Sequence, residues 1–272
     1  MSTIVLEGGS PRSLVNELRR LVQHRDLLLL LTQKDLKLKY KGTALGFVWS
    51  FLNPLLMMIV YATVFSVVAR VSMPNYPVFL LAGMLPWNAF IISINTASMT
   101  IVGNANLIRR VNFPREFLPL ASVLSSLVNL GLSLVILFVF ALAFRQPLGL
   151  PLLALPALIL LQLALTSGLA LILASLMVYF RDVENLIVLA TTVLFFATPI
   201  IYPLSLVHRH NLQVVLGLNP LYWMVHAYQS IWHENSWPDP GQVLLLSLVS
   251  IASLVAGWVV FRRLEGNFAE EV

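Results

Sequence analysis

Long stretches without a charged side chain are the feature that most restricts how this chain can fold. A helix needs roughly 20 apolar residues to cross the hydrocarbon core of a bilayer, and several uncharged stretches reach or exceed this length. Only 11% of the residues are charged, against about 25% in a soluble domain. The stretches predict an all-α integral membrane protein with six transmembrane helices, at about residues 47–69, 78–102, 117–144, 152–180, 185–202 and 243–261.

The basic residues indicate the orientation of these spans. The first 26 residues contain no apolar core long enough for a signal peptide, so we expect the N-terminus to stay in the cytoplasm, uncleaved. Six spans then return the C-terminus to the same side, and cytoplasmic loops carry an excess of Lys and Arg. The cytoplasmic side receives Arg12, Arg19, Arg20, Arg25, Lys34, Lys37, Lys39, Lys41, Arg109, Arg110, Arg115, Arg181, Arg262 and Arg263. The outer side receives only Arg70, Arg145 and Arg209.

One further uncharged segment, 210–233, leaves the number of spans open. As a seventh span it would move Arg262 and Arg263 outside and weaken the charge asymmetry. It also contains amide and imidazole side chains, which are costly in lipid. We favour a pair of short helices that dip into the outer leaflet and are broken at Asn219-Pro220, because non-spanning backbone is tolerated where protein or water covers it.

The segment before the first span has the pattern of an amphipathic helix. Ser10-Pro11 is suited to start a helix, and the next turns place apolar residues opposite charged ones. A basic amphipathic helix beside a first span usually lies in the membrane interface, and we favour anchoring to anionic membrane lipids over a platform for a substrate or partner. The expected organisation is one transmembrane domain, 1–272, with a cytoplasmic amphipathic N-terminus (1–41), a six-span bundle (47–261) and a cytoplasmic tail (262–272).

The sequence contains no motif for an energy source. No glycine-rich loop ends in Lys-Ser or Lys-Thr, and the absence of cysteine excludes thiol catalysis and iron–sulfur clusters. His208 and His210 form a pair on the outer side, but solvated loop histidines explain them better than a metal site. The spans also lack the Asp, Glu or His with which ion-coupled carriers bind their ions. A pump of this kind needs a separate ATPase, and the confinement of the charges to loops argues against a nucleic-acid partner.

The loop at 103–116 is the best candidate for a protein contact. The rule that cytoplasmic loops are basic accounts for its arginines but not for the apolar residues between them. A short helix lying against another protein or the lipid headgroups accounts for both kinds of residue. The interleaved residues are Arg109, Arg110 and Arg115 with Leu107, Ile108, Val111 and Phe113.

Six motifs, taken in order, resemble those of permeases that export polysaccharides. Each motif is weak by itself, but the ordered set over roughly residues 35–262, with the same topology, is specific. The motifs are Asp35–Leu55, Ala82-Gly-Met-Leu-Pro-Trp87, Leu107–Pro119, Phe180-Arg-Asp-Val183, Thr198-Pro-Ile-Ile-Tyr202 and Asn219-Pro-Leu-Tyr-Trp223.

The resemblance implies a type 2 ABC exporter permease of the O-antigen, capsule and teichoic-acid group. Such permeases work as homodimers in the bacterial plasma (inner) membrane, with two copies of a separate ATP-binding subunit that holds ATP and magnesium. They move a polysaccharide on a polyprenyl (pyro)phosphate lipid from the cytoplasmic to the outer face. The chain itself is then not an enzyme and binds no cofactor.

The resemblance also gives roles to two segments. The loop matching 104–116 docks into the ATPase in this family, and the segment matching 206–236 forms outer gate helices. We expect ATPase coupling through Arg109, Arg110, Val111, Phe113 and Arg115. The expected gate residues are Asn219, Pro220, Tyr222 and Trp223.

Two further sites follow from the chemistry of such a substrate. Lysine and arginine are the usual partners of phosphate, and aromatic rings offer apolar faces to sugars. The expected pyrophosphate contacts are Lys37, Lys39, Lys41, Arg109 and Arg110. The expected glycan path comprises Trp49, Tyr61, Phe65, Trp87, Phe90 and Tyr202.

Three other functions compete with polysaccharide export. A drug, haem or antibiotic exporter has the same scaffold, but not this 113–116 loop together with the Leu45-Gly46 and Trp49 motif. A membrane-embedded glycolipid transferase would show paired acids or histidines near one leaflet, where this chain offers only Asp182 with Glu184 and the outer histidines. An ion-coupled carrier is disfavoured by the spans without acids or bases.

Overall fold

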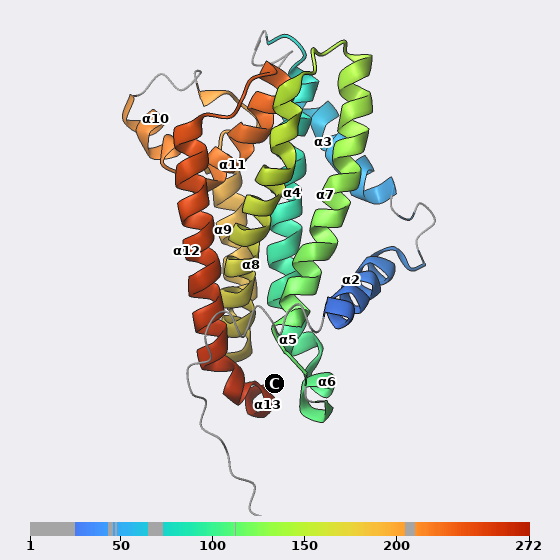
Figure 1. The fold of residues 1–272 in the computed structure, drawn as a ribbon, viewed down its shortest axis with the longest axis vertical. Coiled ribbons are helices and arrows are strands. Elements are labelled where there is room, and N and C mark those ends of the chain that lie inside the picture. The colour runs from blue at the N-terminus through green and yellow to red at the C-terminus, as the bar shows by residue number, and fades with distance from the viewer. Residues whose placement is uncertain (1–24, 43–45, 47, 65–72, 112, 205–209) are drawn as a thin grey trace, which may run out of the picture.

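The structure, a computed structural model, describes residues 25–42, 46, 48–64, 73–111, 113–204 and 210–272. These residues are mostly helical, with no β-strand among them. The four helices in this part that are long and apolar enough to cross a membrane are α4 (Tyr76–Ser98), α7 (Phe117–Ala143), α8 (Leu155–Tyr179) and α12 (Pro240–Leu264). They run side by side as a bundle (Figure 1). The prediction of an all-α, multi-pass membrane fold is confirmed.

The helices at the other two predicted spans are shorter. α3 (Val48–Thr63) and α9 (Val183–Ala197) are apolar but below the usual length of a span. α9 ends early because Thr198 precedes a proline and is extended, as residues before proline usually are. Residues 65–69 of the predicted first span and residues 1–24 of the amphipathic segment lie outside the described residues. The number of six spans therefore stays a prediction.

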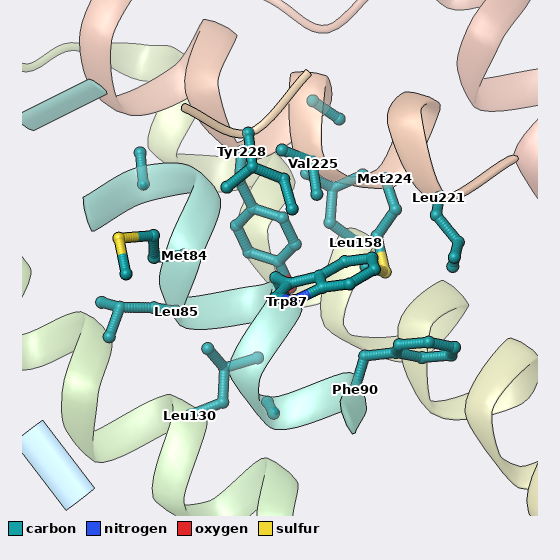
Figure 2. Close-up of a cluster of buried hydrophobic side chains, with 14 of the residues drawn as sticks. Met84, Leu85, Trp87, Phe90, Leu130, Leu158, Leu221, Met224, Val225 and Tyr228 are labelled. Carbon is teal, nitrogen blue, oxygen red and sulfur yellow. The ribbon is translucent and has the colours of Figure 1, made fainter. Parts of the chain in front are cut away.

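α4 is the central helix of the bundle. It packs against α3, α7, α8 and α11 (Pro220–Gln229), and most of its residues are buried. Trp87 belongs to this core, in one cluster with Leu158 of α8 and Met224 of α11 (Figure 2). A helix that is apolar on all sides is stable only where protein or lipid surrounds it, and here protein does so.

Two glycines bring α8 and α12 into close contact. A Cβ atom on Gly168 would lie 2.2 Å from the backbone of Ser253, and one on Gly257 would lie 2.1 Å from the carbonyl oxygen of Gly168. The Ser253 hydroxyl donates to the carbonyl of Leu165 at 3.1 Å. Small residues four apart, here Ser253 and Gly257, allow membrane helices to approach this closely. The crossing fixes the position of α12, and hence of the residues that follow it.

A chain of hydrogen bonds joins three helices inside the core. Gln162 of α8 donates through Nε2 to the carbonyl of Pro86 in α4 at 2.9 Å. The hydroxyl of Tyr228 in α11 donates to Oε1 of Gln162 at 3.0 Å. Gln162 and Tyr228 are fully buried, so these bonds replace the water that both groups would otherwise bind. α11 is thereby held on the bundle by a polar contact as well as by packing.

Replacing Tyr228 with Phe should lower the midpoint of thermal unfolding in detergent. The change removes the donor to Gln162, and a buried acceptor that loses its donor costs about 1–3 kcal/mol. The double variant Y228F/Q162L removes the acceptor as well, and we expect it to recover part of the loss. An unfolding midpoint of Y228F equal to that of the unmodified chain would show that the bond adds nothing to stability.

Candidate coupling surface and substrate path

The loop between α4 and α7 forms two short helices at one end of the bundle. α5 (Thr100–Gly103) and α6 (Ala105–Arg110) meet at Asn104, whose side-chain amide donates to the carbonyl of Thr100 at 2.8 Å. α6 ends where Val111 turns to an extended conformation. In Figure 1, α6 lies at the same end of the bundle as α13 (Phe268–Glu271), which packs against it.

The apolar residues of this loop differ in their burial. Ile108 is buried in a cluster with Ile101, Leu118, Phe261 and Phe268, and Leu107 packs against the same cluster. Val111 is 49% exposed. The apolar residues that suggested an intermolecular contact therefore divide: Ile108 belongs to the core of this chain, and Val111 remains at the surface.

The residues after α12 fold back onto the loop. α12 runs past Phe261 to Leu264 and continues into a 3₁₀ turn, η5 (Glu265–Asn267), before α13. The ring of Phe268 is fully buried and lies 5.3 Å from that of Phe261, centroid to centroid. The hydroxyl of Tyr179 donates to the carbonyl of Leu264 at 3.1 Å. The segment expected to be a plain cytoplasmic tail is thus packed against the base of the bundle.

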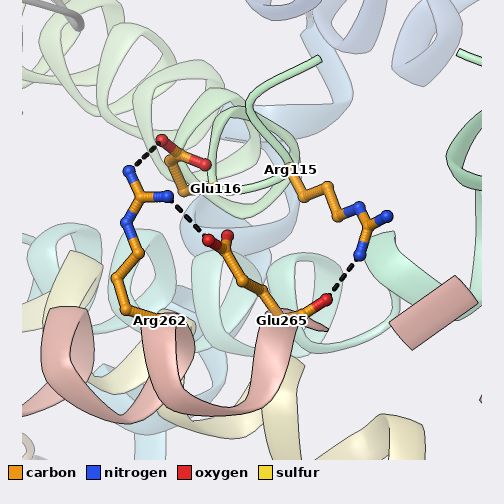
Figure 3. Close-up of polar contacts among 4 residues, drawn as sticks. All are labelled: Arg115, Glu116, Arg262 and Glu265. Atoms are coloured by element: carbon orange, nitrogen blue, oxygen red, sulfur yellow. Dashed lines mark hydrogen bonds and ion pairs between the residues drawn. The ribbon is translucent and has the colours of Figure 1, made fainter. Parts of the chain in front are cut away.

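An ion-pair network fastens this tail to the start of α7. Arg262 contacts Glu116 at 3.0 Å and Glu265 at 2.7 Å, as Figure 3 shows. The Glu116 side chain is 1% exposed, so its charge depends on a nearby cation. Arg115 donates to the carbonyl of Glu265, and both residues line, with Phe113, a cavity of about 200 Å³. The loop and the tail therefore form one unit.

The five predicted coupling residues surround α6 but differ in their contacts. Arg110 and Val111 are exposed. Arg109 is also exposed and donates to the carbonyl of Val272. Phe113 and Arg115 are half-buried beside the tail. The surface open to a partner is therefore formed by Arg109, Arg110 and Val111, while the other two residues support it from behind.

The predicted phosphate contacts lie on two elements. Lys37 and Lys39 are in the last turn of α2 (Arg25–Tyr40), and Lys41 follows the helix. α2 packs along α7, where the Ser122 hydroxyl donates to Oδ2 of Asp35 at 2.8 Å. The Lys34 ammonium donates to Oδ1 of Asn104 at 3.4 Å, which connects α2 to the start of α6.

The aromatic residues of the predicted glycan path divide into exposed and buried rings. Trp49 is 50% exposed on α3. Trp87 and Phe90 are buried in the core, so they present no surface to a glycan in this conformation. Tyr202 is half-buried and donates to the carbonyl of Phe196 at 2.8 Å. Phe65 lies outside the described residues.

Phe195, which was not assigned to the path, connects two of these rings. Its ring centroid lies 6.1 Å from that of Tyr61 and 5.8 Å from that of Trp87. Phe195 therefore links α3, α9 and α4 through ring contacts. Its place in a run of apolar residues gave no signal that separated it from Phe196.

Two of the six motifs, Thr198–Tyr202 and Asn219–Trp223, contact each other in the structure. α10 (His210–Gly217) and α11 are separate short helices, and Asn219 caps α11 by accepting a hydrogen bond from the Leu221 amide at 3.0 Å. The side-chain amide of Asn219 donates to the Thr198 hydroxyl at 2.9 Å. Pro220 is the first residue of α11, and Tyr222 and Trp223 are buried. The Asn219–Thr198 bond joins the end of α9 to the start of α11.

Comparison with known proteins agrees with the motifs. Residues 26–232 match the family model described as ABC-2 type transporter. The chain is 37% identical over 260 residues to a Myxococcus xanthus protein named O-antigen export system permease protein RfbA, covering 95% of this chain and all of the relative. Two Klebsiella pneumoniae proteins of the same name are 32% and 30% identical, each covering 90% of this chain and 94% of the relative. The chain therefore belongs to the ABC-2 type transporter family, as a membrane subunit of a transporter.

Proposed function

We propose that this chain is the transmembrane subunit of an ATP-driven exporter for an O-antigen-like polysaccharide. The observation that carries the proposal is the similarity, over almost the whole chain, to relatives named as O-antigen export permeases. The cargo is a glycan on a polyprenyl (pyro)phosphate lipid, and it moves from the cytoplasmic to the outer face. A small-molecule exporter on the same scaffold is not favoured, because the relatives are named as permeases for O-antigen, which is a polysaccharide.

The proposed assembly is a homodimer with two ATP-binding subunits in the bacterial inner membrane. ATP and magnesium belong to those partners. Six spans place both termini in the cytoplasm, with α3 and α9 as the short first and fifth spans. The excess of basic residues on the proposed cytoplasmic side supports this orientation. The contact between α6 and α13 supports placing the 103–116 loop and the C-terminal tail on the same side of the membrane.

The docking surface that we propose for the ATP-binding subunit is the exposed part of α6. Arg109, Arg110 and Val111 offer charge and an apolar patch at the surface, and the tail holds α6 in place from the other side. Phe113 and Arg115 act by supporting this surface. The pyrophosphate is proposed to meet the lysines at the end of α2 before the glycan passes the aromatic residues of α3 and α9.

The outer gate is proposed at the start of α11. The Asn219–Thr198 bond couples α11 to α9, and Tyr222 and Trp223 anchor α11 in the core. A movement of α9 would therefore be passed directly to α11. This arrangement supports a gate that opens together with the bundle and not independently of it.

The docking surface can be tested by co-expressing the chain with the ATP-binding subunit from the same genome. We expect R110E/V111D to reduce co-purification of that subunit and its transport-coupled ATP turnover at least tenfold, because like charge and a buried carboxylate oppose docking. The control is R145E, at the α7–α8 turn, where Arg145 is exposed and far in sequence from α6. Unchanged ATP turnover in R110E/V111D would refute docking through α6, and absence of any ATP-binding partner would refute the exporter itself.

A further inference from the structure

The segment that links α11 to α12, residues 230–236, has an unusual backbone. It begins with a π-helical turn, η4 (Ser230–Glu234), which contacts α4. Across this turn the Ser236 amide donates to the carbonyl of Ser230 at 3.0 Å, and Asn235 adopts a left-handed conformation. π-helical turns are rare and are frequently found at functional sites. We refer to residues 230–236 as the strap.

Gln146, in the turn between α7 and α8, bonds with one side chain to both the strap and the start of α4. Its Nε2 donates to the carbonyl of His233, and its Oε1 accepts from Nδ2 of Asn75 at 2.6 Å. Gln146 is 7% exposed, so both bonds are shielded from water. A buried amide whose donor and acceptor are both used holds its neighbours in one arrangement. A single side chain thus connects three segments that are far apart in the sequence.

The polar side chains of the strap gain little from this packing. Among the described residues, Trp232 Nε1, His233 Nδ1 and Asn235 Oδ1 are buried without a hydrogen-bond partner. Each buried polar group of this kind costs about 1–3 kcal/mol. A movement of the strap toward water would give all three atoms partners, so the free energy of these groups favours release. The bond from Gln146 to the His233 carbonyl opposes it.

Backbone strain is concentrated at the same place. In the described part of the chain, the non-glycine residues with positive φ are Asn75, Arg145 and Asn235, at 51°, 52° and 52°. Asn75 and Arg145 flank the Gln146 contact, and Asn235 belongs to the strap. Such conformations persist where the surrounding structure enforces them, and they cluster at clamps and switch regions. A strained segment with unpaired polar groups, held by one amide, has the properties of a releasable contact.

We propose that Gln146 is a positioning residue that latches the strap, and that the strap is released when the outer gate opens. The inference rests on the proposed function, because only a transporter needs an outer gate. α11 itself stays on the bundle, since Nε2 of Gln229 donates to the carbonyl of Ile200 at 3.1 Å. Release is therefore confined to the residues after Gln229. Ser230, which is 2% exposed in the latched conformation, would then become accessible to water.

The test measures this accessibility through a single thiol. The chain has no cysteine, so S230C can be labelled with a water-soluble maleimide in nanodiscs and the label detected by the mass of the chain. Without ATP, Q146M should raise the labelling rate of S230C at least tenfold, because methionine occupies similar space but cannot donate to the His233 carbonyl. The matched control Q242M removes the contact of Gln242 with His226 and should change the rate less than twofold.

A second variant and a second condition complete the test. N75G removes the bond from Asn75 to Gln146 without straining the left-handed backbone, and it should raise the rate at least threefold even if Q146M does not fold. In the complex with the ATP-binding subunit, ATP should speed the labelling of S230C at least tenfold but that of Q146M/S230C less than twofold.

Three results would overturn the latch. They are unchanged labelling in Q146M and N75G, equal rates in Q146M and Q242M, and a complex that hydrolyses ATP but labels at the same rate with and without it. Failure of the chain to bind any ATP-binding subunit would instead refute the proposed function. In that case the comparison of Q146M with Q242M, made on the chain alone and without ATP, still decides whether Gln146 holds the strap.

Discussion

Adding a single methyl group at Gly168 or Gly257 is expected to destabilise the protein strongly. A Cβ atom at either position would lie little more than 2 Å from backbone atoms of the facing helix. Backbone cannot move aside as a flexible side chain can, so α8 and α12 must separate along their crossing. Overpacking of a close-packed core costs about 1–3 kcal/mol, and two rigid helices place each alanine at the upper end or beyond. Thermal unfolding in detergent measures the effect.

Gly131 provides the matched control for this prediction. It lies within α7, and a Cβ atom there would meet no atom within 4 Å. Alanine favours the helix over glycine by about 1 kcal/mol, so G131A should be neutral or slightly stabilising. The same Gly→Ala change is thus expected to lower the unfolding midpoint at the α8–α12 crossing but not at Gly131. Equal unfolding midpoints for G131A, G168A and G257A would show that the crossing of α8 and α12 is not as close as described.

Removing the cation of the network at the base of the bundle should have the second large effect. R262M takes away the guanidinium that lies 3.0 Å from the buried Glu116 carboxylate and 2.7 Å from Glu265. Breaking a buried pair by removing one partner typically costs about 3–5 kcal/mol, because a charge stays behind in the interior. We expect a large drop in the unfolding midpoint, and a loss of transport-coupled ATP turnover because the tail no longer holds α6.

Two variants separate this effect from a general loss of charge. R263M removes the neighbouring arginine, which is exposed, and should change stability by no more than about 0.5 kcal/mol. E116M/R262M removes the buried Glu116 charge together with its partly buried partner and should recover much of the stability, since apolar replacement of a whole ion pair is often neutral. A double variant as unstable as R262M would contradict the assigned pairing.

The sequence was sufficient for the parts of the fold that depend on local pattern. Uncharged length identified the helices α4, α7, α8 and α12, and Asn219-Pro220 marked the start of α11, where a cap and a proline commonly stand. The family followed from the order of six motifs. These features need only neighbouring residues, so one sequence contains them.

Features that depend on contacts between distant residues could not be predicted. In the sequence, Gly168 looks like any glycine inside an apolar helix, and only the structure shows that it faces the backbone of Ser253. The sequence suggested that Arg109 and Arg115 contact a partner protein, yet both donate hydrogen bonds to backbone carbonyls of this chain's own tail. Trp87 and Phe90 have the residue type expected of a sugar path but are buried in the core. Residue type alone does not tell which side of a helix faces the protein.

The docking of the tail onto the loop has a consequence for biosynthesis. Arg115 and its acceptor on Glu265 are 150 residues apart in the chain. A ribosome therefore releases α6 long before it has made the residues that hold it, and at about 5–20 residues per second this interval lasts several seconds or more. During this time α6 lacks its partners from the tail. An ATP-binding subunit that docks on α6 as proposed would consequently be recruited only after residues 262–272 are made, so incomplete chains would not stimulate its ATP turnover.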